Sequence, residues 1–311
     1  MKGYDALRGG AAWFDLSSRG KIYASGEDRA RLLHALSTNH VQQLNPGTGC
    51  YALFLNAQGR ILADANLFCL DERILIDTEP EARGRLFQHI DHYIIADDVT
   101  LEDASETLAC VAIEGPEAAG AMSALGAASP DSAAAPYSNG IWADRRLVVR
   151  ASYTGAPGWR IFLPADEVAD ITQGLEEADI DAVRTVRLEH AKPRCGEDFS
   201  EATIAQEAQQ THALHFSKGC YLGQEIVERV RSRGHLNKLL VSLVVDAKAP
   251  PQPGTKLLAG GAEIGEVTSA SFSPALGKVA ALGYVRAAHA APGSVVICEG
   301  NESRVGLLWT L

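Results

Sequence analysis

The pattern of apolar residues changes near Leu239, and this change restricts the chain to few architectures. Before it, short alternating runs typical of strands are interspersed with amphipathic helical patterns. After it, short β-rich runs are separated by breakers such as Pro250 with Pro251 and Gly260 with Gly261, a pattern typical of a small all-β barrel. We therefore predict two regions, residues 1–235 and residues 236–311.

The first region contains two groups of helices and antiparallel strands. In the first group, apolar runs at 51–55 and 61–67 flank a turn at 56–59, which predicts a hairpin. A third strand is expected at 74–77, followed by a helix whose buried stripe includes Leu86 and Ile90.

The second group repeats this arrangement. We expect a strand at 107–113, a helix at 116–125, a low-complexity surface loop at 126–139, a hairpin of 147–152 with 159–163, and helices at 166–178 and 179–190. Two such groups indicate two α+β layers, each with helices on one face of an antiparallel sheet.

Composition excludes several classes of protein. The net charge of −11 leaves no broad basic face for phosphate contacts, so we expect no direct binding to nucleic acid. No apolar run approaches the roughly 18 residues of a membrane helix, and the N-terminus lacks a targeting pattern, so we expect a cytoplasmic protein without a membrane partner. The closest cysteines, Cys50 and Cys69, are 19 positions apart, so no zinc motif and no metal site are expected.

One segment carries distinctive chemistry: residues 218–225, KGCYLGQE. Its two glycines allow a sharp turn and a close approach to a ligand. Lys218 lies two residues from Cys220, and an ammonium near a thiol favours the nucleophilic thiolate. Gln224 and Glu225 can begin a helix. A cysteine in a glycine turn can equally be a packed small residue, and both interpretations stay open here.

Two further features could bind an anionic ligand with a polar ring. Arg229, Arg231, Arg233 and Lys238 form the concentrated positive stretch of an acidic chain, which would suit polyglutamate carboxylates or would be a solvated loop. Glu189 closes a predicted helix, where its carboxylate could accept the paired donors of a pterin or guanine edge or could be a surface charge.

Residues 218–225 resemble the K-G-C-[FY]-x-G-Q-E signature of YgfZ-type folate-binding proteins, which are related to the glycine-cleavage T-protein. The resemblance extends over nearly the whole chain and includes residues 14–17, 26–29, 56–64, 187–189 and 265–269.

The resemblance implies an α+β fold of two ferredoxin-like lobes and a C-terminal β-barrel, arranged as a three-lobed ring around a channel that binds tetrahydrofolate. It implies that Glu189 holds the pterin, that Arg229 lies along the channel, and that Cys220 is a functional thiol with Lys218 beside it. Asn56, Tyr221, Gln224 and Glu225 are the further residues expected to bind the cofactor.

The function implied is that of an accessory protein in the assembly or repair of iron–sulfur clusters, rather than a conventional enzyme. Its partners would be folate and iron–sulfur proteins or their assembly machinery, including radical enzymes that modify tRNA.

The chain departs from the T-protein pattern in one respect that bears on activity. T-proteins carry two adjacent aspartates after the hairpin glycine, and this chain has Ala63 and Asp64 there; their asparagine in the next strand corresponds to Asp77. The loss of one carboxylate argues against aminomethyl transfer. The alternative is a folate-dependent aminomethyl or other one-carbon transferase, or a demethylase, with Asp64 as catalytic carboxylate. A third hypothesis is a tRNA- or protein-binding scaffold that uses the 229–238 stretch.

Overall fold

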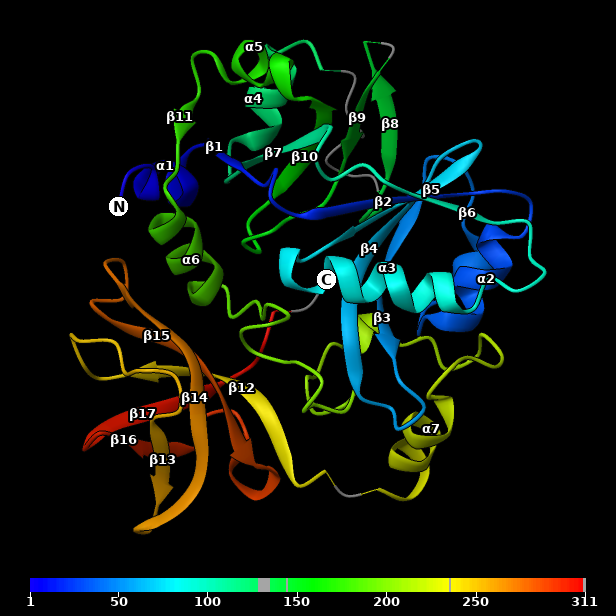
Figure 1. Cartoon of the computed structure of the whole chain (residues 1–311). Helices are drawn as coiled ribbons and strands as arrows, with labels where there is room; N and C mark the ends of the chain where they lie inside the picture. The colour runs from blue at the N-terminus through cyan, green and yellow to red at the C-terminus, as the bar shows by residue number, and fades with distance from the viewer. Residues whose placement is uncertain (128–134, 144, 235, 310–311) are drawn as a thin grey trace.

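The computed structural model describes residues 1–127, 135–143, 145–234 and 236–309. Three lobes surround the middle of the molecule (Figure 1). Two are sheets covered by helices, and the third is a closed barrel. The α+β class and the C-terminal barrel expected from the sequence are thereby confirmed.

The first lobe is a five-stranded antiparallel sheet in the order β3-β4-β5-β2-β6. Its strands are β3 (Gly49–Leu55), β4 (Ile61–Cys69), β5 (Arg73–Thr78), β2 (Gly20–Ser25) and β6 (Thr100–Asp103). The helices α2 (Arg29–Leu36) and α3 (Arg83–His92) pack their apolar stripes on one face of this sheet. The opposite face turns toward the centre of the molecule.

Strand β4 shows how the two faces differ. Ala63, Ala65 and Leu67 point into the core under the helices. Asp64 and Asn66 alternate with them, so they point to the central face, because successive side chains of a strand leave it on opposite sides. The alternation therefore places polar groups of the first lobe at the middle of the molecule.

The second lobe is a six-stranded sheet in the order β11-β1-β7-β10-β9-β8. Its strands are β1 (Ala12–Asp15), β7 (Leu108–Glu114), β8 (Asn139–Trp142), β9 (Arg146–Val149), β10 (Gly158–Pro164) and β11 (Glu176–Glu177). One face packs against α4 (Ala118–Ala124) and α5 (Val168–Thr172). The other packs against α1 (Tyr4–Gly9), α6 (Ile180–Glu189) and the first sheet, through side chains such as Phe68 and Phe162.

The prediction of a helix at 166–178 is wrong over most of its length. Only α5 (Val168–Thr172) is α-helical there, preceded by a short 3-10 turn, and Glu176 and Glu177 form β11 instead. This strand pairs in parallel with Ala12 and Trp13 of β1. Tertiary pairing with a distant segment therefore overrides the local helical pattern. Of the loop expected at 126–139, residues 128–134 lie outside the described residues.

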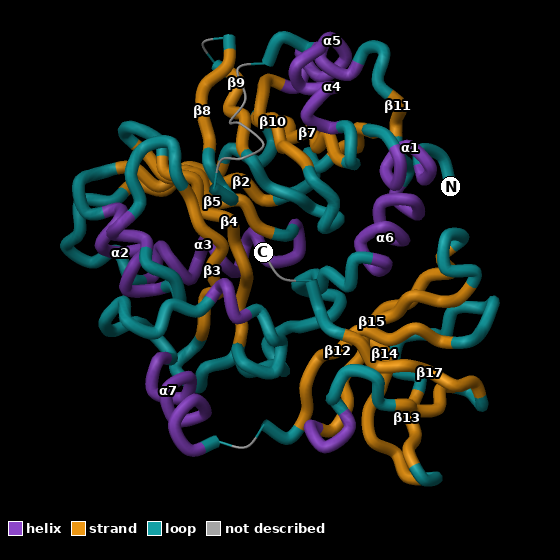
Figure 2. The backbone as a smooth tube through the Cα atoms, turned by 180° about the vertical axis from the view of Figure 1, so that it is seen from behind, coloured by secondary structure: helices purple, strands orange, loops and turns teal. Residues whose placement is uncertain are grey.

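The third lobe is a closed barrel in the order β12-β15-β14-β13-β16-β17. Its strands are β12 (Lys238–Val245), β13 (Lys256–Ala259), β14 (Ala262–Ser273), β15 (Lys278–Arg286), β16 (Val295–Cys298) and β17 (Asn301–Gly306). Helix α7 (Gln224–Arg233) precedes it at the edge of the first lobe (Figure 2). The predicted division at residue 235 stays a prediction, since that residue lies outside the described part of the chain.

Candidate active site

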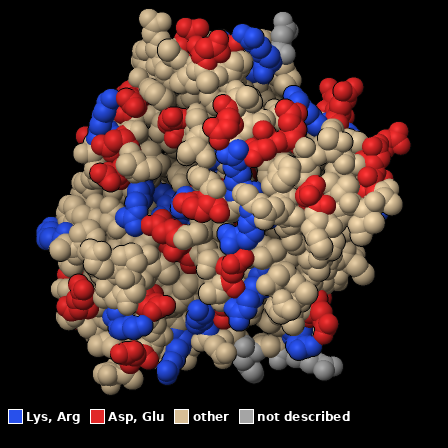
Figure 3. Space-filling model, viewed as in Figure 1, with Lys and Arg blue, Asp and Glu red and all other residues tan. Residues whose placement is uncertain are grey.

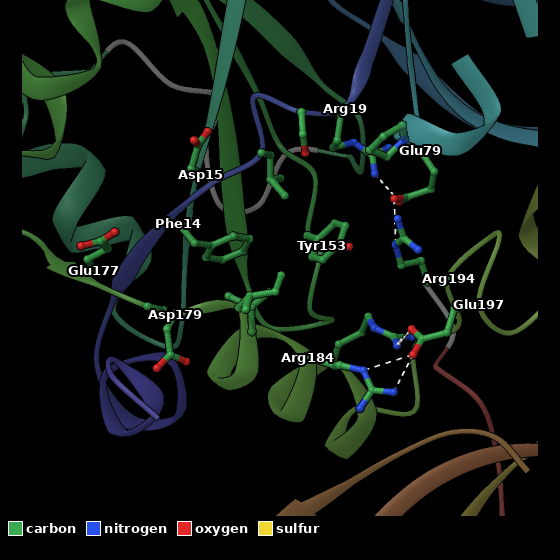
Figure 4. Close-up of a pocket in the computed structure, with 17 residues that line it drawn as sticks. Phe14, Asp15, Arg19, Glu79, Tyr153, Glu177, Asp179, Arg184, Arg194 and Glu197 are labelled. Atoms are coloured by element: carbon green, nitrogen blue, oxygen red, sulfur yellow. Dashed lines mark hydrogen bonds and ion pairs between the residues drawn. The ribbon is translucent and has the colours of Figure 1, made fainter. Parts of the chain in front are cut away.

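Figure 3 shows acidic and basic side chains mixed around the middle of one face, where the lobes meet. A cavity of about 510 Å3, which we call the outer cavity, lies between β1, α6 and the loop after α6. Figure 4 shows Tyr153 inside it, with Phe14 on one side and Arg194 on the other. The remaining lining is mixed, and includes Leu16, Val183, Asp179, Arg184, Arg187 and Glu197.

Helix α6 supplies one wall of the outer cavity. Asp179 caps the helix by accepting a hydrogen bond from the Ala182 backbone N–H at 2.7 Å. Arg184 Nη2 lies 2.6 Å from Glu197 Oε1, and the buried Arg187 lies 2.9 Å from Asp198. These pairs hold the arginines of α6 in place, because both partners of each pair come from one short stretch of chain.

A second, smaller cavity of about 40 Å3 lies beside the outer one, and we call it the inner cavity. The two share five lining residues, namely Arg19, Glu79, Tyr153, Arg187 and Arg194. The rest of the inner lining includes Tyr51, Asp64, Asn66, Tyr137, Arg160, Lys192, His212 and Trp309.

The shared wall is held by buried ion pairs. Arg19 binds Glu79, and Arg194 Nε lies 2.9 Å from the other oxygen of Glu79. Asp77 accepts from Arg19 Nε at 2.6 Å and also from Arg160 of the second lobe. Burial alone would raise the pKa of Asp77, but the two guanidinium groups outweigh it and the pKa is lowered. Asp77 therefore acts as the anionic centre of the wall.

Asp64 differs from Asp77 in having no cation bound to it. Its Oδ2 accepts a hydrogen bond from the Tyr51 hydroxyl at 2.8 Å, and the Tyr51 ring stacks on His212 with 5.1 Å between centroids. Its Oδ1 is buried and has no hydrogen-bond partner among the described residues. Burial, with a contribution from the Glu79 charge, raises the pKa of Asp64 to about 6. A carboxyl group with that pKa can donate and accept protons near neutral pH.

Lys192 enters the inner cavity from the loop after α6. Its Nζ donates to the Ser152 carbonyl oxygen at 2.5 Å and lies 4.1 Å from the centre of the Trp309 ring. Burial, and then the nearby Arg160 charge, lowers the pKa of Lys192 to about 7. Lys192 and Trp309 also line a third cavity of about 270 Å3, which we call the side cavity. The inner cavity thus adjoins a larger cavity on each of two walls.

The segment 218–225 lies elsewhere, on the β3–β4 hairpin. Lys218 is only 5% exposed, and its Nζ donates to the carbonyl oxygens of His34 and Ser37 at the end of α2. The same ammonium lies 4.8 Å from the centre of the Tyr221 ring. Burial lowers the pKa of Lys218 to about 8. These contacts direct the Lys218 ammonium toward α2. The expected effect of this ammonium on the Cys220 thiol stays a prediction.

The other residues of this segment face solvent or bind locally. Cys220 is exposed, and Arg229 forms an exposed pair with Glu225 along α7. Gln224 accepts a hydrogen bond from the Tyr221 backbone N–H at 3.1 Å. Asn56 similarly accepts from backbone N–H groups within its own turn. None of these six residues lines the outer, inner or side cavity. The role of Cys220 as a functional thiol and the roles of the other five in folate binding stay predictions.

Glu189 lies on the side of α6 that faces α1 and the barrel. Its carboxylate accepts from the Tyr4 hydroxyl, from Arg8 Nη1 at 2.9 Å and from Ser273 Oγ at 2.5 Å. These contacts join three parts of the chain, and Glu189 is not among the residues that line the three cavities. Its expected role at the pterin also stays a prediction.

The structure changes the significance of Ala63. Ala63 is fully buried under the helices of the first lobe, whereas Asp64 faces the inner cavity. The position at which the aspartate pair is lost therefore points away from the site, and the carboxylate that faces the cavity is retained. Strand alternation could have shown this from the sequence.

Several site residues gave no signal in the sequence. Lys192 and Trp309 belong to no recognisable motif of neighbouring residues. His212 lies three positions before His215, and this spacing did not indicate a site. Arg19 and Glu79 flank the first-lobe strands and meet only when β2 and β5 pair. Long-range pairing brings these side chains together, so no spacing within one segment could have identified them.

Comparison with known proteins agrees with this architecture. Residues 2–218 match the GCVT N-terminal domain, and residues 238–305 match the glycine cleavage T-protein C-terminal barrel domain. An aminomethyltransferase of Rubrobacter xylanophilus is 30% identical over 91% of this chain and 78% of the relative, and one of Streptomyces coelicolor is 29% identical over 93% and 82%.

Among solved structures, the glycine cleavage system aminomethyltransferase T of Bartonella henselae superposes with a TM-score of 0.88. It covers 98% of this chain and 87% of its own, at 23% identity, and so supports the fold alone. The two domain matches together span most of the sequence. The chain therefore belongs to the glycine cleavage T-protein family.

Proposed function

We propose that the protein is a folate-dependent one-carbon transferase of the aminomethyltransferase type. The observation that carries this proposal is Asp64, a buried carboxyl group with one unpartnered oxygen in the inner cavity, beside a cavity large enough for a cofactor. The names of the relatives favour the transferase over the iron–sulfur accessory role expected first.

The residues present fit a reduced folate. The outer cavity lies within the range of about 300–1,000 Å3 usual for such ligands. Phe14, Leu16, Val183 and Tyr153 offer apolar and aromatic surface for a flat ring. Arg184 and Arg194 also line this cavity, and they would bind the carboxylates of a ligand in exchange for their present glutamate partners. Tetrahydrofolate, when bound, supplies the nitrogen that accepts the one-carbon unit.

The inner cavity is far too small for a pterin ring, so it suits the reacting one-carbon group. Asp64 would hold or release a proton there, since its pKa of about 6 lets both forms be populated near neutral pH. The ion pairs of Arg19, Glu79 and Arg194 hold the wall in place. A preorganised wall of this kind limits reorganisation during the reaction.

Asp64→Asn tests this proposal. We expect turnover with tetrahydrofolate and an aminomethyl donor to fall at least about 100-fold, while the folate dissociation constant stays within about threefold. Binding is measured by titration calorimetry and turnover by formation of the methylene derivative. A variant with undiminished turnover would remove Asp64 from the chemistry, and a wild-type chain without folate binding would refute the proposal as a whole.

Glu189→Ala tests the predicted pterin contact. If Glu189 holds the pterin donors, the loss should be about 2–4 kcal/mol, or about 30- to 1000-fold in folate affinity. The alternative, that Glu189 only joins α1, α6 and the barrel, predicts a lower unfolding temperature with unchanged affinity. Calorimetry and thermal unfolding on the same preparation separate the two outcomes.

The second candidate is the accessory role for iron–sulfur proteins, and exposed Cys220 is the observation that favours it. A thiol on the surface, in the segment that resembles the YgfZ-type signature, is accessible to a partner protein. Cys220→Ala should then abolish rescue of a cluster-dependent enzyme in a deletion strain and leave aminomethyl transfer intact. Full rescue by this variant would count against the role.

A further inference from the structure

Lys192 is a half-buried residue, and among the described residues its amine has no direct counter-ion. Within the described parts of the chain, no carboxylate lies within ion-pair distance of its Nζ, which contacts the Ser152 carbonyl oxygen and the Trp309 ring. The acidic group Glu114 is committed to hydroxyl and N–H groups of Ser152, Tyr153 and Thr154.

Burial of the Lys192 ammonium is the main reason that its pKa is lowered, and the charges around it act in both directions. The charges of Arg160 and Arg19 lower the pKa of Lys192. The charges of Glu114 and Asp64 raise it, although neither carboxylate binds the ammonium. The neighbouring His212 is itself disfavoured as a cation, and burial and then Lys192 lower its pKa to about 4. With a pKa of about 7, a large fraction of Lys192 carries a free electron pair at neutral pH. A desolvated lysine of this kind is a nucleophile toward carbonyl groups.

The size of the inner cavity limits what can react there. A single water needs about 10–15 Å3 of such space, so about 40 Å3 admits a molecule of only a few heavy atoms. Formaldehyde meets this limit. Lys192 also lines the side cavity, whose lining includes the exposed Pro136, and this gives small molecules a route to the amine.

We propose that the inner cavity captures formaldehyde as an imine on Lys192, next to the carboxyl group of Asp64. The inference rests on the proposed function, because it names the one-carbon substrate that this site would pass on. The Lys192 nitrogen forms a bond to the aldehyde carbon and loses a proton, while the carbonyl oxygen gains one. The C–O bond of this carbinolamine then breaks, Asp64 donates the second proton, and water leaves. The product is the iminium of Lys192 with an ionised Asp64.

Two groups are placed to favour this step. Asp64 Oδ1 has no hydrogen-bond partner, so it is available to the departing oxygen. The Trp309 ring, which lies under the ammonium, offers the same electron-rich face to an iminium cation. No oxidant or reductant is consumed, so the capture is reversible and the one-carbon unit can be released to an acceptor.

The test uses the full chain without added folate. The protein is mixed with isotopically labelled formaldehyde at about pH 7 and reduced with cyanoborohydride, which converts an imine into a stable N-methyl group. Lys218 and Lys21 are internal controls, since both are buried with lowered pKa but bind carbonyl oxygens outside the cavities. We expect Lys192 to be labelled at least about tenfold more than either control, as measured by peptide mass spectrometry.

Asp64→Asn should slow the labelling of Lys192 at least about tenfold and leave the labelling of Lys218 unchanged. Lys192→Arg, checked for folding by circular dichroism, removes the label. Equal labelling of Lys192, Lys218 and Lys21, or labelling of Lys192 that does not change when Asp64 is replaced, would overturn the inference. Unlabelled Lys192 in a chain that still transfers aminomethyl groups would refute the inference and leave the proposed function standing. Labelled Lys192 in a chain that does not bind folate would support the inference and refute the proposed function.

Discussion

At the scale of single residues, the pKa values of two aspartates on neighbouring strands are shifted in opposite directions. Asp77 is bound by two arginines, which lower its pKa despite burial. Asp64 lacks a bound cation, and burial raises its pKa to about 6. The same side chain thus gives an anion at Asp77 and a group that titrates near neutral pH at Asp64, and the position of the arginines decides between the two.

Asp64 should therefore cost stability at high pH. Its pKa is about 4 in the unfolded chain and about 6 in the folded one, so stability falls as pH rises from about 4 to about 6 and is flat above. Asp64→Asn should be about 2–3 kcal/mol more stable than the wild type at about pH 8. Urea unfolding of both proteins from about pH 4 to 8 checks this. A gain that persists below about pH 4 would show that burial of the charge is not its cause.

At the scale of elements, local pattern predicted part of the first two lobes, and it gave no expectation for β1, β2, β6 and β8. The β3–β4 hairpin, the α6 helix and the start of α7 at Gln224 follow from apolar spacing and turn residues near one another in sequence. The prediction of a helix at 166–178 failed because β11 pairs with β1, which lies far away in the sequence. The site residues Lys192 and Trp309 could not be predicted, since their environment comes from segments that meet only in the folded chain.

The seating of α7 on the hairpin depends on one glycine. Gly223 has φ of +82°, and a Cβ there would lie 2.6 Å from the Asn56 carbonyl oxygen. Gly223→Ala should lower the free energy of unfolding by more than about 2 kcal/mol, from backbone strain and the clash together. Gly219→Ala is the matched control: φ is +95°, but the added Cβ meets open space, so only about 1 kcal/mol of strain is expected. Equal losses would mean that the close contact with the hairpin is unimportant.

At the scale of the whole molecule, the buried charges join the lobes. Asp77 belongs to β5 of the first lobe and binds Arg160 on β10 of the second. The central face thus acts as an interface as well as a site. In the described part of the chain, no helix combines the length and apolar character needed to cross a bilayer.

Asp77→Asn should lower the free energy of unfolding by about 3–5 kcal/mol, because it leaves two buried guanidinium groups without their shared anion. Glu106→Gln is the control, since its pair with Arg83 is exposed and should contribute less than about 1 kcal/mol. Urea unfolding measures both. A loss at Asp77 no larger than that at Glu106 would show that the lobes do not depend on this anion.

Trp309 follows the last barrel strand and returns to the other two lobes, where its backbone N–H donates to Ala191 and its indole N–H to Gly155. The floor beneath Lys192 is consequently made by a residue that follows the strands of all three lobes in the sequence. During synthesis, the first two lobes can acquire their sheets while the inner cavity is still open on that side. A chain cut between Gly306 and Trp309 would therefore keep all of the strands and lose one wall of the inner cavity.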